Sequence, residues 1–99
     1  MMRRRKGLGG VTDAQLQRSA RNNINLGRGA LIRAGTRSKS CERQFVQLVK
    51  ASAHLKSAET TIGMMEVATK EKIKLKREHG LAIRTARTTL SRFKDRCFV

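Results

Sequence analysis

The chain has 99 residues, room for one domain at most, and 23 Lys and Arg against 7 Asp and Glu give it a formal net charge of +16. It contains no Trp, Tyr or Pro and only three Phe, which excludes an aromatic-rich core and disfavours a turn-rich β fold. No apolar run approaches the roughly 20 residues that a membrane span needs. From the composition we expect an all-α protein with a thin aliphatic core. Because the high net charge opposes a compact fold, we expect an anionic partner to screen the charge and complete the fold.

Residues 1–10 are predicted to form a flexible basic arm that precedes a single helical domain at 11–99. The arm carries Arg3, Arg4, Arg5 and Lys6, followed by Gly7, Gly9 and Gly10. These glycines are not a phosphate-binding loop, because no GK[ST] sequence follows them. No apolar segment follows the charges either, which argues against a secretory signal. We therefore expect a cytoplasmic or virion-type reducing compartment, with an organellar matrix as the alternative.

The first helix is predicted at about 12–34. Thr12 and Gln15 have the spacing of a capping box, and Asp13 lies in the first turn, where the helix dipole favours an acid. Gly27 weakens the middle of this helix and predicts a break there, and Gly35 is the expected end.

A second helix is predicted at about 41–79 and a third at about 81–97, separated at Gly80. Ser40 is the expected N-cap of the second helix. Its apolar residues recur every three or four positions, at Cys41, Phe45, Leu48, Ala51, Leu55, Ala58, Ile62 and Met65. The third helix has the same spacing at Ile83, Ala86, Leu90, Phe93 and Cys97. This pattern predicts a long central helix that packs as a helical hairpin or coiled coil.

A β-hairpin is the alternative for residues 70–87. Ile73 and Leu75 alternate with lysines, and Leu81 and Ile83 alternate on the other side of a three-residue loop. We favour the helix, because each strand would have only two apolar positions.

The two cysteines match no metal-binding spacing, and we expect both to be free thiols. If the chain folds back at Gly80, Cys97 lies near residues 62–65. Cys41 is then roughly 30 Å away along the second helix, which excludes a disulfide unless residues 70–87 form the hairpin or the second helix bends at Gly63.

Basic residues are concentrated in the arm, in the first helix and after residue 69, and such clusters bind phosphate backbones by counterion release. The predicted nucleic-acid-binding residues are Arg3, Arg4, Arg5, Lys6, Arg18, Arg21, Lys70, Lys72, Lys74, Lys76, Arg77, Arg84 and Arg87. The apolar residues Phe45, Leu48, Leu55, Ile62 and Met65 are the predicted partner interface.

Catalysis is not expected, because His54 and His79 are far apart and neither has a neighbouring nucleophile and acid. We expect no metal and no cofactor. The leading hypothesis is a non-enzymatic structural protein that binds DNA or RNA with little sequence preference, as part of a ribonucleoprotein, nucleoid or virion interior. The alternative is a helical subunit or adaptor that docks on acidic protein surfaces. Either would be part of a larger assembly or self-associate.

Overall fold

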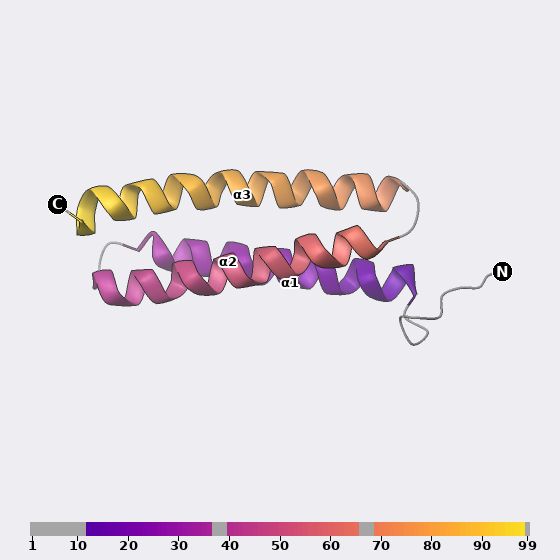
Figure 1. The fold of residues 1–99 in the computed structure, drawn as a ribbon, viewed down its shortest axis with the longest axis horizontal. Helices are drawn as coiled ribbons and strands as arrows, with labels where there is room; N and C mark the ends of the chain where they lie inside the picture. Colours follow the sequence, from indigo (N-terminus) through magenta and orange to yellow (C-terminus); the bar gives the residue numbers. More distant parts are fainter. Residues whose placement is uncertain (1–11, 37–39, 66–68, 99) are drawn as a thin grey trace.

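The computed structural model describes residues 12–36, 40–65 and 69–98 and is all-helical over them (Figure 1). The helices are α1 (Asp13–Ala34), α2 (Cys41–Met64) and α3 (Lys70–Cys97). The described residues contain no strand, which confirms the all-α part of the predicted fold class. The β-hairpin alternative for residues 70–87 is wrong, because this whole segment lies within α3.

Helix α1 has the predicted start and end. The Thr12 hydroxyl accepts a hydrogen bond from the Gln15 backbone N–H at 3.2 Å, and Gln15 Oε1 accepts one from the Thr12 N–H at 2.9 Å. The helix ends at Ala34 and is capped by Gly35. The predicted break at Gly27 is wrong. This glycine is buried, and a Cβ there would lie 3.0 Å from Leu55 of α2, so Gly27 serves close packing between helices.

The predicted boundary between the second and third helices is also wrong. Helix α2 ends at Met64 instead of 79, and α3 begins at Lys70 instead of 81. The Thr69 hydroxyl accepts a hydrogen bond from the Lys72 N–H at 3.1 Å, and Glu71 lies in the first turn, so this helix start has an ordinary N-cap. Gly80 lies inside α3 and has open space where a side chain would be.

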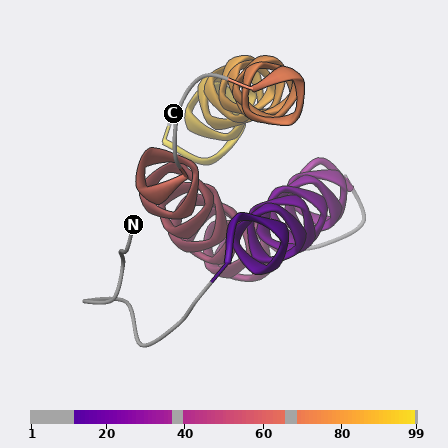
Figure 2. The same cartoon turned by 90° about the vertical axis from the view of Figure 1, so that its right-hand side faces the viewer.

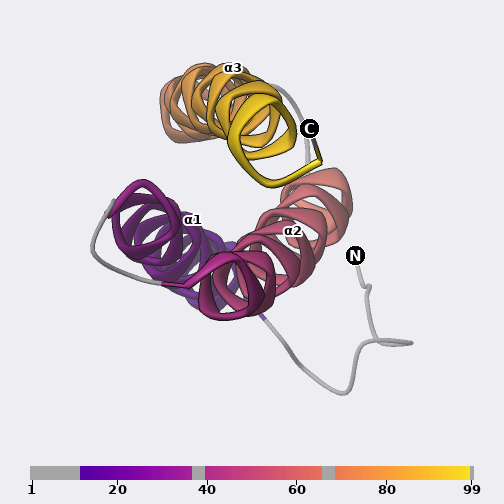
Figure 3. The same cartoon turned by 90° about the vertical axis from the view of Figure 1, so that its left-hand side faces the viewer.

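Consecutive helices are antiparallel, so α1 and α3 run in the same direction (Figure 1), and the three helices lie at the corners of a triangle when viewed from either end of the molecule (Figures 2 and 3). Helix α3, the longest with 28 residues, runs alongside both α1 and α2. Because the number of helices is odd, α1 begins at one end of the bundle and α3 finishes at the other (Figure 1).

The core is aliphatic, as predicted. Its fully buried members include Ile24 of α1, Leu55 of α2 and Leu75 of α3. Many of the buried residues of α1 and α2 are alanines, namely Ala20, Ala30, Ala34, Ala51 and Ala58. Among the described aromatic residues only Phe93 is buried, and Phe45 and Phe98 are exposed.

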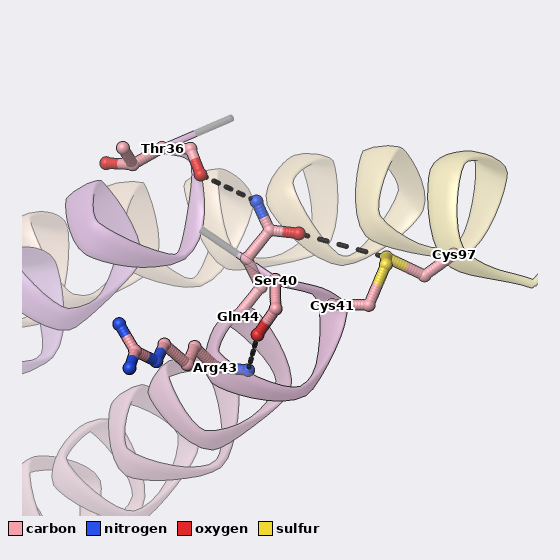
Figure 4. Close-up of a disulfide and its surroundings, with 6 residues drawn as sticks. All are labelled: Thr36, Ser40, Cys41, Arg43, Gln44 and Cys97. Atoms are coloured by element: carbon pink, nitrogen blue, oxygen red, sulfur yellow. Dashed lines mark hydrogen bonds between the residues drawn. A yellow bond between two sulfur atoms is a disulfide. The ribbon is translucent and has the colours of Figure 1, made fainter. Parts of the chain in front are cut away.

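The cysteines form a disulfide, which overturns the prediction of two free thiols (Figure 4). The prediction placed the chain reversal at Gly80. The actual reversal lies between Met64 and Lys70, so the C-terminal end of α3 reaches the N-terminal end of α2. The Cα atoms of Cys41 and Cys97 are 5.8 Å apart, within the range for a disulfide.

A buried glutamine joins the ends of all three helices beside this disulfide. The Gln44 amide nitrogen of α2 donates a 2.8 Å hydrogen bond to the Thr36 carbonyl, just beyond α1. Its side-chain oxygen lies 3.8 Å from the Cys97 sulfur of α3 (Figure 4). Gln44 is only 1% exposed, so the amide and the disulfide fix this end of the bundle together.

We expect Gly80→Ala to stabilise the protein by about 1 kcal/mol, because alanine is the better helix former and nothing obstructs its methyl group. Thermal unfolding followed by circular dichroism measures the effect. The matched control is Gly27→Ala, where the methyl group meets Leu55 and the variant should be less stable than Gly80→Ala. A destabilised Gly80→Ala variant would contradict a continuous α3.

We expect the double variant Cys41→Ser, Cys97→Ser to lose about 2–4 kcal/mol of unfolding free energy, because the disulfide closes a loop across a sequence separation of 56. Urea unfolding with and without reductant measures the loss. Reductant should destabilise the wild-type chain and leave the double variant unchanged; equal stability of the two proteins without reductant would contradict the bridge.

Candidate nucleic-acid interface

Helix α3 carries most of the predicted nucleic-acid-binding residues within the described part of the chain. Lys70, Lys74, Lys76, Arg77, Arg84 and Arg87 are all exposed on this one helix. Its acidic residues are Glu71, Glu78 and Asp95. Because α3 is one continuous helix, these positive charges are held in fixed positions along it.

The charges of α3 follow straight lines along its surface. Lys70, Arg77 and Arg84 are spaced by seven residues, so they lie nearly in line and about 10 Å apart. Arg84 comes nine residues after the buried Leu75, which places it half a turn around the helix. This line, which we call the outer line, therefore faces away from the core.

Lys72 differs from the other predicted residues of α3. Its side chain is half-buried, and its Nζ donates a 2.9 Å hydrogen bond to the carbonyl oxygen of Met65, the C-cap residue of α2. Cations near a helix C-terminus are favoured by the carbonyl dipoles. Lys72 thus holds the beginning of α3 to the end of α2, which leaves it little freedom to contact a ligand.

The two predicted residues of α1 are in different surroundings. Arg18 is exposed. Arg21 is half-buried against α3, with its Nη2 3.9 Å from Glu78 Oε1. Its Nε is buried and has no hydrogen-bond partner among the described residues. Arg21 therefore adds positive charge at the boundary between α1 and α3, where Glu78 partly neutralises it.

The arm residues Arg3, Arg4, Arg5 and Lys6 lie outside the described residues. The structure adds exposed cations that the sequence-based site omitted, Arg92 and Lys94 of α3 and Arg28 of α1. Arg92 follows Lys74 by 18 residues and therefore lies in line with Lys74, beside the outer line of α3. Sequence patterns alone did not predict the alignment of Lys74 with Arg92, because the predicted helix boundary at Gly80 lies between the two residues.

Most of the predicted apolar interface is core. Leu55, Ile62 and Met65 are each less than 5% exposed and pack inside the chain. Leu48 is half-buried and Phe45 is 53% exposed. The prediction that this whole row serves a partner is therefore wrong for its last three members, because α1 and α3 cover them.

Other classes of site receive no support from the described part of the chain. It contains no grouping of His, Cys, Asp and Glu that would hold a metal ion. No helix in it is long and apolar enough to cross a bilayer. Comparison with known protein families, with curated proteins and with solved structures gives no match for this chain.

We expect Lys72→Gln to destabilise the protein by about 1 kcal/mol relative to Lys74→Gln, because only Lys72 donates a charged hydrogen bond to the end of α2. Both substitutions remove one positive charge from the same helix, so net charge is matched. Urea unfolding of the two variants measures the difference. Equal stabilities would contradict the role assigned to Lys72.

Proposed function

We propose that this chain is a non-enzymatic structural protein that binds the phosphate backbone of duplex or structured nucleic acid. The observation that supports this most is the continuous basic α3, with its exposed outer line of Lys70, Arg77 and Arg84. A phosphate backbone presents charges at regular intervals along a rigid axis, and a rigid row of cations on a helix complements it. Each contact releases condensed counterions, which supplies most of the binding free energy.

The chemistry of this surface favours recognition of charge over recognition of bases. Base readout in single strands relies on aromatic side chains that stack on the bases. The exposed aromatic residues Phe45 and Phe98 belong to the disulfide end of the bundle and are not interleaved with the outer line. Arginine and lysine contacts to phosphate position a protein without reading sequence. Low sequence preference is therefore part of the proposal.

The predicted arm would extend the same surface. Residues 3–6 are joined to the Thr12 end of α1, and Lys70 begins α3 at that same end of the bundle (Figure 1). Four further cations there would lengthen the contact with a polyanion. In a ribonucleoprotein, nucleoid or virion interior such a chain would act as a charge-neutralising spacer between nucleic-acid segments.

The disulfide indicates the redox conditions under which the protein would bind nucleic acid. Disulfides persist in oxidising surroundings and are rare where glutathione keeps thiols reduced. The Cys41–Cys97 bond therefore supports a particle or compartment that is exposed to oxidising conditions, in place of the reducing compartment expected from the sequence.

We expect the wild-type chain to bind duplex DNA or RNA with an affinity that falls steeply with salt, with a log–log slope of about −5 for six phosphate contacts. The variant Lys70→Gln, Arg77→Gln, Arg84→Gln should weaken binding and make the slope shallower by about 2 to 3. Fluorescence anisotropy across 50–300 mM salt measures both quantities. No binding at 50 mM salt, or a flat salt dependence, would contradict the proposal.

The matched control is Arg43→Gln, Lys50→Gln, Lys56→Gln, which removes three exposed positive charges from α2. It should leave the slope closer to the wild-type value than the α3 variant does. Equal effects of the two triple variants would mean that net charge alone governs binding and that α3 is not the interface.

A further inference from the structure

A groove of about 580 Å³ runs between α2 and α3. Phe45, Leu48 and Val49 line its α2 side, and Ile83 and Leu90 line its α3 side. The buried Leu55 also contributes to its lining. The groove is on a different part of α3 from the outer line, because Ile83 and Leu90 lie on the flank that faces α2.

The groove exists because α3 is held to α2 at separated points with small side chains between them. The disulfide joins the helices at one end, and His79 Nε2 donates a 2.8 Å hydrogen bond to the Leu55 carbonyl further along. Ser52 and Ala86 line the stretch between these contacts and are too short to fill it. The apolar walls consequently remain open to solvent.

The exposed fractions of the wall residues are large for apolar side chains. Phe45 is 53% exposed, Val49 51% and Leu90 41%. Exposed apolar side chains gathered in one groove and bordered by polar residues are a common feature of binding sites. Along α2 the lining runs from Phe45 to Glu59, about 21 Å, which matches an α-helix of about 14 residues. A groove between two antiparallel helices accepts a third helix by ordinary ridge-and-groove packing.

The charged residues around the groove indicate which kind of partner helix it would bind. Lys56 and Arg87 lie in its wall, opposed there by the one carboxylate of Glu59. Lys76 and Lys94 are spaced 11 and 7 residues from Arg87, so all three follow the α3 flank beside the groove. A second copy of this chain would bring another +16 of charge to this rim and is disfavoured by repulsion. A helix with an acidic polar face would instead be attracted.

We propose that this groove binds an acidic amphipathic helix of a partner protein, with the apolar face of that helix between Phe45, Val49 and Leu90 and its carboxylates beside Lys56 and Arg87. The groove is separate from the outer line of α3, while Arg87 in its wall and Lys76 beside it also belong to the predicted nucleic-acid-binding residues. The chain would thus join a polyanion, on the outer line of α3, to a protein on the α2–α3 groove.

The test uses a fluorescein-labelled, end-capped 14-residue peptide with leucines at helical i, i+3, i+4, i+7 spacing and glutamates at the other positions. We expect the full-length chain to bind it, and Val49→Asp to weaken binding by about tenfold or more, because a carboxylate then faces the apolar wall and the acidic peptide. The matched control is Val46→Asp. Val46 is on the same helix and 45% exposed but does not line the groove, and this variant should change affinity less than twofold. Both variants should bind duplex DNA alike.

Several outcomes would overturn the proposal. Failure of the wild-type chain to bind the peptide would do so, as would equal weakening by Val46→Asp and Val49→Asp. Equal binding of a scrambled peptide of the same composition would show attraction by charge alone. Equal binding of a version with lysine in place of glutamate would remove the acidic requirement. Dimerisation of the wild-type chain in sedimentation equilibrium, abolished by Val49→Asp and kept by Val46→Asp, would assign the groove to a second copy. None of these results depends on nucleic-acid binding.

Discussion

The close approach of α1 and α2 is the contact on which the rest of the bundle depends. Gly27 has no side chain where Leu55 crosses it, and alanines on both helices bring the two backbones near each other. Ile24 and Leu55 then become fully buried although the chain has few large apolar residues. A bulkier residue at Gly27 would push α2 outward and open this part of the core. Helices α1 and α2 are thus stabilised by the tight packing of glycine and alanine residues, because large apolar side chains are scarce.

Because α1 and α2 contribute most of the buried apolar residues, α3 packs on them with few apolar contacts of its own. Its buried residues are only Leu75, Ala82 and Phe93 along 28 residues. Directional contacts supplement them at intervals, namely the Lys72 ammonium on the Met65 carbonyl, the His79 ring on the Leu55 carbonyl, and the disulfide. Because few residues of α3 are buried, most of the surface of this helix is open to solvent and carries its cations. Self-repulsion of those cations opposes folding, and the covalent bond at the far end of α3 offsets part of that cost.

The sequence predicted local features well and long-range ones poorly. The Thr12 cap and the aliphatic core follow from short-range patterns and are confirmed. The reversal was misplaced because Gly80 after His79 resembles a helix end, whereas a single glycine costs a helix only about 1 kcal/mol. The actual signal, Thr69 with Glu71, is weaker in the sequence because Lys72 occupies the position where a capping box has Glu or Gln. That one error also separated Cys41 from Cys97. The basic residues were identifiable from composition, but their alignment on α3 and the groove beside α2 depend on where the chain turns.

An odd number of antiparallel helices gives the molecule a direction. The end where α1 and α3 begin is joined to the basic residues 3–6, and the other end carries the disulfide and the exposed ring of Phe98 (Figure 1). The two poles are separated by the length of α3, about 42 Å. Such a rod is not equivalent when turned end over end, so a neighbouring molecule that contacts one pole meets different chemistry from one that contacts the other.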